Sequence, residues 1–219
     1  MRGGVKGRKE QYCELRKGEK MFVDVEDVYS AKKRYEIILA DPPWKYNSRM
    51  AEGKGAKRSS SDDYYNTMTI DEIKKLKVKD ILSKDSMLFI WGTWPKIREV
   101  FEVIDAWGFT YKTCAFVWVK RNKLYNEKRA MLRGGIDDFM GQGRWSRGNS
   151  EFCLLATKGK PKRLSADVRQ IIYSPIRAHS QKPDEQYQLI ERLNSCKNKI
   201  ELFARKEFEG WDCFGDEIY

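Results

Sequence analysis

Short apolar runs alternate with amphipathic stretches along most of the chain. The apolar runs predict strands at Met21–Val25, Tyr35–Ala40, Ser86–Trp91, Thr113–Val119, Glu151–Thr157, Arg169–Tyr173, Lys199–Ala204 and Asp212–Ile218. Their near-continuous apolar content is typical of strands that are buried on both faces of a sheet. The alternation with amphipathic segments therefore predicts an α/β domain with a mostly parallel central sheet and helices on both faces.

Three amphipathic segments carry signals for the beginning of a helix. We expect helices at Thr69–Leu82, Pro95–Trp107 and Pro183–Leu193, because a capping threonine or a first-turn proline opens each of them. The remaining long stretches, at 45–63, 121–149 and 158–168, are basic and rich in Gly, Ser and Arg. Long loops inside a compact domain are usually functional, so we expect these to surround a binding site.

The length of 219 residues predicts one domain, which we place at 21–219 after a basic extension at 1–20. No apolar run approaches the roughly 20 residues that cross a bilayer, and the first residues lack the apolar centre of a signal peptide. We therefore expect a soluble, cytoplasmic protein with no membrane contact.

The charge of the chain points to a polyanionic partner. Lys and Arg outnumber Asp and Glu by 43 to 32, which gives a net charge of +11. Binding to phosphates releases counterions and favours such a surface, although an excess of charge can also serve only solubility. The five cysteines are scattered and His179 is the only histidine, so we expect no metal site.

The segment Asp41-Pro42-Pro43-Trp44 directly follows the apolar run Tyr35–Ala40. A strand that ends in a carboxylate places that acid at the carboxyl edge of the sheet, where open α/β folds bind ligands. The prolines lack N–H groups and stiffen the backbone, so the turn offers a carboxylate and a carbonyl as acceptors. Two acceptors beside an aromatic ring suit a planar group that carries an NH₂, such as the 6-amino group of adenine. The alternative is a plain Pro-Pro turn with Trp44 in the core.

With these residues and several further segments, the chain resembles the adenine N-6 methyltransferase family that includes the catalytic subunit of the messenger-RNA adenosine methyltransferase. The matching segments follow the family's order: DPPW at 41–44, YYNTMT at 64–69, GRWSRGNSEFCLLATKGKP at 143–161, AHSQKPDEQYQLIERL at 178–193 and KIELFARKEFEGWDCFGDE at 199–217. The resemblance implies a circularly permuted, Rossmann-like methyltransferase fold with S-adenosylmethionine as cofactor.

The resemblance also implies roles for single residues. Asp41 and the Pro42 carbonyl would hold the target amine, Asp41 would also meet the cofactor's ammonium group, and Trp44 would stack on the base. The cofactor-binding residues would be Asp24, Lys158, Arg205, Asp216 and Glu217, and the target nucleoside would be bound by Tyr65 and Glu151. Around Trp145, the basic residues Arg144 and Arg147 are of the types that clamp phosphates. His179 and Lys182 belong to the matching segments, but we derive no role for them.

These observations predict methylation of the 6-amino group of adenine in nucleic acid. DNA is the expected substrate, because the chain lacks the extensions of the messenger-RNA enzyme, and RNA is the near alternative. Two other classes stay open: a non-catalytic nucleic-acid-binding partner of a methyltransferase, and a metal-dependent nuclease that uses acids such as Glu201. The intact acid and prolines at 41–43 favour an enzyme, which would act as a homodimer or as a heterodimer with a related protein.

Overall fold

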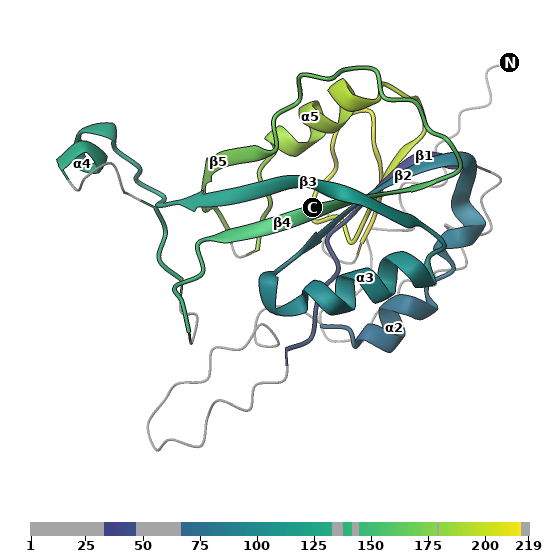
Figure 1. Cartoon of the computed structure of the whole chain (residues 1–219), viewed down its shortest axis with the longest axis horizontal. Helices are drawn as coiled ribbons and strands as arrows, with labels where there is room; N and C mark the ends of the chain where they lie inside the picture. Colours follow the sequence, from purple (N-terminus) through teal and green to yellow (C-terminus); the bar gives the residue numbers. More distant parts are fainter. Residues whose placement is uncertain (1–32, 47–66, 133–137, 142–144, 179, 216–219) are drawn as a thin grey trace, which may run out of the picture.

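The computed structural model describes residues 33–46, 67–132, 138–141, 145–178 and 180–215 (Figure 1). The predicted basic extension at 1–20 and the predicted strand Met21–Val25 lie outside these residues. The four described cysteines are free. None of the described helices has the length and apolar character that crossing a bilayer requires.

Within the described residues, seven strands form one sheet in the order β5-β3-β4-β2-β1-β6-β7. Their bounds are β1 Tyr35–Ala40, β2 Leu82–Gly92, β3 Thr110–Arg121, β4 Ser150–Lys158, β5 Ile171–Pro175, β6 Lys199–Leu202 and β7 Asp212–Phe214. All neighbouring pairs are parallel except the two that involve β4, which runs antiparallel to both β2 and β3. The predicted α/β fold with a mostly parallel sheet is therefore confirmed.

The helices begin largely where the sequence predicts, but two of its details are wrong. Thr69 caps α2 (Ile70–Lys75), since its hydroxyl accepts from the Glu72 N–H and the Glu72 carboxylate accepts from the Thr69 N–H. The predicted helix Thr69–Leu82 is interrupted after α2 and continues as the 3₁₀ turn η2 (Val78–Ile81). The long loop expected at 121–149 contains a short helix, α4 (Glu127–Leu132).

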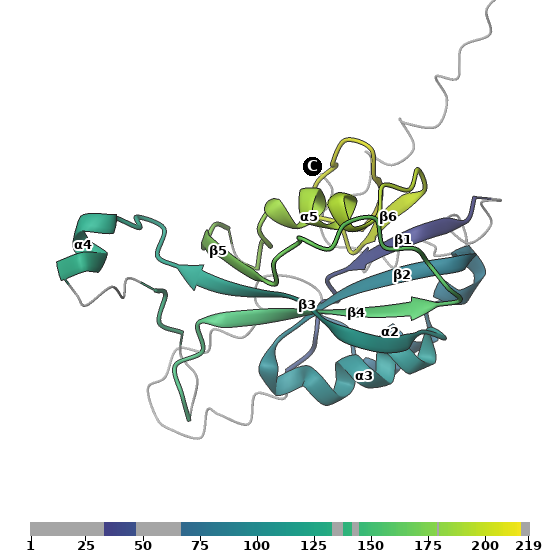
Figure 2. The same ribbon diagram turned by 45° about the horizontal axis from the view of Figure 1, so that its top comes forward.

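Two further helices follow the predictions closely. The predicted helix Pro95–Trp107 is the 3₁₀ turn η3 (Trp94–Lys96) followed by α3 (Ile97–Ala106). The predicted helix Pro183–Leu193 is α5 (Glu185–Leu193). Figures 1 and 2 place α2 and α3 on one face of the sheet and α5 on the other, while α4 lies at the far end of the β3–β4 connection.

Separate hydrophobic cores cover the two faces of the sheet. In β1, Ile38 and Ala40 pack into the core that includes α2 and α3, whereas Ile37 and Leu39 pack into the core that includes α5. This alternation follows from the two-residue period of a strand, and all four side chains are fully buried. The strand is thus anchored on both faces up to its last residue, which fixes the position of Asp41.

The order of the strands reverses at β1. After β1 the chain builds β2, β3, β4 and β5 on one side and then returns to add β6 and β7 on the other. The parallel strands β1 and β6 are direct neighbours at this reversal. In open α/β sheets the crevice beyond the carboxyl ends of such strands is where ligands bind.

Candidate active site

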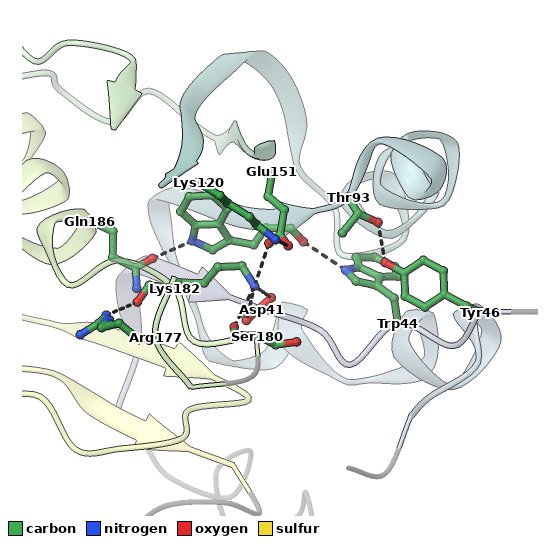
Figure 3. Close-up of polar contacts among 11 residues, drawn as sticks. Asp41, Trp44, Tyr46, Thr93, Lys120, Glu151, Arg177, Ser180, Lys182 and Gln186 are labelled. Atoms are coloured by element: carbon green, nitrogen blue, oxygen red, sulfur yellow. Dashed lines mark hydrogen bonds and ion pairs between the residues drawn. The ribbon is translucent and has the colours of Figure 1, made fainter. Parts of the chain in front are cut away.

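Asp41 follows β1 at this crevice and is held by a lysine from the other end of the chain. The Lys182 ammonium group donates to both carboxylate oxygens of Asp41, at 2.8 and 2.7 Å (Figure 3). The side chain of Lys182 is only 8% exposed, and its backbone lies just before α5. The predicted position of Asp41 at the carboxyl edge of the sheet is therefore the position that the structure shows.

A second carboxylate completes a buried cluster of charges. Glu151 lies 3.2 Å from the Lys182 ammonium and 2.5 Å from the Lys120 ammonium, which reaches it from β3. The four side chains Asp41, Glu151, Lys120 and Lys182 carry two negative and two positive charges, so the cluster is neutral as a whole. Such pairing is what allows charged groups to stay buried.

The pKa values of this cluster follow from the pairing. Burial alone would raise the pKa of Glu151, but the ammonium groups of Lys182 and Lys120 outweigh it and lower that pKa below its ordinary value. Burial alone would lower the pKa of Lys182, but the carboxylates of Asp41 and Glu151 raise it above its ordinary value. Glu151 and Lys182 therefore both remain charged around neutral pH.

The loop that carries Lys182 is fixed on both sides. Arg177 and Lys206 both pair with Asp184, at 2.7 and 2.6 Å, and thereby tie the loop before α5 to the loop after β6. Gln186 in the first turn of α5 accepts a hydrogen bond at 2.6 Å from the buried Trp91 indole of β2. These contacts hold the Lys182 ammonium over the end of the sheet.

Trp44 contradicts its predicted stacking role. The side chain is 5% exposed and packs in the core on the α2 and α3 face, where its indole N–H donates to the Trp91 carbonyl at 3.2 Å. A ring packed in this way presents no face to a base. Its position fixes the turn instead, which is the alternative that the sequence left open for this residue.

The carbonyl groups of the two prolines are partly occupied. The Pro42 carbonyl accepts from the Trp44 N–H at 2.8 Å, and the Pro43 carbonyl accepts from the Met68 N–H at 2.8 Å. A carbonyl oxygen has two lone pairs, so Pro42 retains one for a substrate amine. The Met68 contact connects the turn to the segment before α2, which shapes this side of the crevice.

Lys158 contradicts its predicted place at the cofactor. It is paired with Ser86 near the beginning of β2, whereas Phe152 is paired with Gly92 at the end of β2. Because β4 is antiparallel, its first residues lie at the carboxyl edge with Asp41, and its last residue lies roughly 20 Å away at the opposite edge. The same reversal explains why Glu151, at the beginning of β4, reaches the site.

Arg205 lies in the loop after β6 and therefore at the carboxyl edge, and its contact with the cofactor remains a prediction. Trp145 and Arg147 lie before β4 in the β3–β4 connection, where Trp145 is 98% exposed and Arg147 is exposed as well. The predicted residues Asp24, Tyr65, Arg144, Asp216 and Glu217 lie outside the described residues, as does His179. Their roles remain predictions.

Glu201 near the end of β6 is a structural acid. It is 7% exposed, and its carboxylate accepts a hydrogen bond at 2.7 Å from Tyr187, whose ring stacks on Phe208 with 3.8 Å between the centroids. Burial raises the pKa of Glu201 to about 7, and the charge of Asp41 adds to this effect. Its contact with Tyr187 inside a hydrophobic core gives it a packing role in place of the metal-ligand role of a nuclease.

Sequence reasoning missed Lys120 and Lys182 as site residues. The signal for Lys182 was its position immediately before the proline and acid that open α5, beyond the carboxyl edge of the sheet. The signal for Lys120 was its position directly after the predicted strand Thr113–Val119. Neither pairing follows from the sequence alone, because the partners are separated by 31 and 141 residues.

The reversed strand order, the antiparallel β4 among the described strands and the acid-Pro-Pro turn at the reversal are consistent with a Rossmann-like methyltransferase. The MT-A70 family model matches residues 35–217, and the chain belongs to this family. MT-A70 methyltransferases use S-adenosylmethionine as cofactor. The fold and the cofactor that the resemblance implied are therefore confirmed.

Individual relatives fall into two groups. The chain is 35% identical over 201 residues to the Type II methyltransferase M.MunI of Mycoplasma sp., covering 85% of this chain and 79% of the relative. It is 32% identical over 209 residues to the N(6)-adenosine-methyltransferase subunit METTL3 of Danio rerio, and 31% identical to the METTL3 catalytic subunit of Homo sapiens. Both METTL3 alignments cover 94% of this chain but only 30% of the relative.

Proposed function

We propose that the protein transfers a methyl group from S-adenosylmethionine to the 6-amino group of adenine in DNA. The observation that carries this proposal is the Asp41 carboxylate, which the strand β1 and the two prolines fix at the crevice where the strand order reverses. MT-A70 membership supports the reaction, and the long alignment with a Type II methyltransferase supports DNA.

The turn supplies two acceptors for one amine. One Asp41 oxygen and the free lone pair of the Pro42 carbonyl would accept the two N–H bonds of the adenine amino group. The nitrogen then loses conjugation with the ring, and its lone pair becomes available for attack. Fixed acceptors stabilise the positive charge that develops on this nitrogen in the transition state.

Lys182 is the positioning residue for the acid. By donating to both Asp41 oxygens it fixes the plane of the carboxylate, and each oxygen keeps a lone pair for the incoming amine. Glu151 balances the charge of Lys182 and sits beside Asp41, where it would contact the target nucleoside. The adenine must leave the base stack to reach these groups, as in other enzymes that modify bases.

The donor set fits the cofactor that the family uses. S-Adenosylmethionine presents a cationic sulfonium and an ammonium group, and the cluster offers the carboxylates of Asp41 and Glu151 to such groups. Arg205 follows β6 on the other side of the crevice. The bound cofactor supplies an activated methyl group, so the chain itself has mainly to position the two substrates.

The test is transfer of labelled methyl groups to DNA and RNA oligonucleotides, each single- and double-stranded, with nucleoside analysis of the product. Asp41→Asn should lower turnover by at least 100-fold, because the neutral amide is a weaker acceptor and presents an N–H to the amine. The matched control Asp105→Asn changes an exposed acid on α3 and should leave turnover unchanged. Full activity of the Asp41 variant would overturn the proposal.

RNA is the second candidate substrate, because the METTL3 relatives are named as adenosine methyltransferases and also cover most of this chain. Preferred methylation of the RNA oligonucleotides would select it. The same assay on the purified single protein, combined with its mass in solution, distinguishes a homodimer from an enzyme that needs a related partner. We place the reaction in the cytoplasm of a bacterial or phage-infected cell, in keeping with the bacterial relative.

A further inference from the structure

The last residue of β3, Arg121, is held in an unusual environment. Its guanidinium carbon lies 4.2 Å from the ring centroid of Tyr125 and 4.9 Å from that of Tyr173. The two rings come from different segments, the turn before α4 and the edge strand β5. These two aromatic contacts restrict the orientation of the long side chain. An arginine on an open surface would lack this restriction.

Arg121 has no acidic partner among the described residues. It forms no ion pair there, and its Nε–H is buried without a hydrogen-bond acceptor. The residue as a whole is only partly buried. A buried donor without an acceptor is costly in a native protein and calls for an explanation.

Several other cations in this region do have partners. Lys120, the preceding residue, is paired with Glu151, and Lys182 is paired with both Asp41 and Glu151. Arg121 ends β3 at the same edge of the sheet as Lys120, with its side chain on the opposite face, and it forms no ion pair with Asp138, its neighbour across an antiparallel bridge. The segment that follows carries the exposed residues Lys123, Glu127 and Lys128, with a net positive charge.

We propose that Arg121 is a pre-organised binding site for a backbone phosphate of the substrate strand, next to the nucleotide that enters the active site. This proposal rests on the proposed function and names a contact that positions the nucleic acid. A guanidinium that is stacked on aromatic rings keeps its N–H groups available in its own plane. That edge matches the two oxygens of a phosphodiester in a bidentate contact.

The geometry favours a phosphate over a base as the ligand. Phosphate contacts in nucleic-acid complexes fix the register of the strand, and an arginine held between two rings at the edge of the sheet that carries the catalytic acid suits that task. A guanidinium that read a guanine edge would instead produce a dependence on the neighbouring base. The experiment below separates the two.

The experiment measures binding and methylation of an adenine-containing oligonucleotide with the full chain. Arg121→Gln should weaken binding by roughly tenfold or more, as expected for the loss of a charge-assisted bidentate contact. It should also reduce the magnitude of the slope of log K against log salt concentration by about one, the value expected for the loss of one phosphate contact. Arg121→Lys keeps the charge but loses the planar guanidinium that can donate two parallel hydrogen bonds, so we expect an intermediate affinity. Affinity for S-adenosylmethionine should stay unchanged in both variants.

The control Lys112→Gln removes the same charge near the beginning of β3, roughly 30 Å from Arg121 along the strand. It should weaken binding less than twofold. A scan in which single phosphates near the target adenine are replaced by neutral methylphosphonates needs no mutation. Replacement of the phosphate at one position should weaken binding to the wild-type protein and should not change binding to the Arg121→Gln variant.

The outcomes separate this proposal from the proposed function. If the wild type methylates the oligonucleotide and Arg121→Gln binds it as well as the wild type, the phosphate site is wrong and the function stands. An effect that follows the identity of a neighbouring guanine, and that no methylphosphonate reproduces, also overturns the phosphate site. If the wild type transfers no methyl group, the function fails, while the methylphosphonate scan still decides on Arg121.

Discussion

Removal of Lys182 tests the charge cluster directly. Lys182→Met keeps most of the length of the side chain and removes its charge, which leaves Asp41 and Glu151 as two buried acids. Lys120 can then neutralise only Glu151, from 2.5 Å. The variant should therefore lose both stability and the orientation of Asp41.

The magnitude follows from burial. Breaking a buried ion pair by removing one partner typically costs about 3–5 kcal/mol, because an uncompensated charge stays behind. The Lys182 side chain is 8% exposed, and its partners Asp41 and Glu151 are 15% and 11% exposed, so solvent screens the loss only weakly. The control Lys74→Met removes one partner of the Lys74–Glu102 pair, in which the side chains are 33% and 54% exposed. It should cost at most about 1 kcal/mol.

The pH dependence gives the prediction its sign. In the wild type the lowered pKa of Glu151 contributes stability above the ordinary carboxyl range, which is lost as the pH falls through its folded value. In the variant the Lys182 charge, which counteracts the effect of burial on the pKa of Glu151, is gone, so this pKa rises. A raised carboxyl pKa costs stability at high pH and costs nothing once the acid is protonated. The deficit of the variant should therefore be largest near pH 8 and shrink toward pH 5.

Chemical unfolding of both variants and the wild type between pH 5 and pH 8 measures this, and methyl transfer on the same samples measures orientation. We expect a turnover deficit that persists at protein concentrations and temperatures where the variant is fully folded. A deficit in stability that is the same at every pH, or none at all, would refute the assigned coupling between Lys182 and the two acids.

Three other substitutions probe the frame around the site. In the wild type, stability should decline between about pH 4.5 and pH 7, because burial keeps Glu201 protonated in the folded state while it ionises in the unfolded state. Glu201→Gln should remove this decline. Because the amide can still accept the hydrogen bond from Tyr187, the variant should be more stable than the wild type by about 3 kcal/mol above pH 7. Trp44→Phe should cost about 1–2 kcal/mol in denaturant titrations, because it leaves a buried carbonyl of β2 without its donor. Gly92→Ala should cost about 1–3 kcal/mol, since the added Cβ would lie 2.6 Å from the Val100 side chain; an unchanged midpoint would show that α3 moves freely.

The strands could be predicted from the sequence because burial on both faces leaves a continuous apolar run. The run Tyr35–Ala40 is β1 to the residue, and the acid that ends it lies where the sequence places it. Helix signals worked equally well where a cap determines the first turn, as at Thr69. They failed at the interruption after α2, where backbone geometry and the burial of Val78 and Ile81 decide the course of the chain.

The sequence by itself determined the acidic, proline-stiffened turn, the strands that carry it and the family to which it belongs, because these features are local. The tertiary structure decided what lies around that turn. The direction of β4 brings Glu151 to the site and takes Lys158 to the opposite edge, and the packing of Trp44 turns an expected stacking surface into a core residue. The pairing of Asp41 with Lys182 joins residues 141 positions apart, and only the folded chain brings two such charges together in a place from which water is excluded.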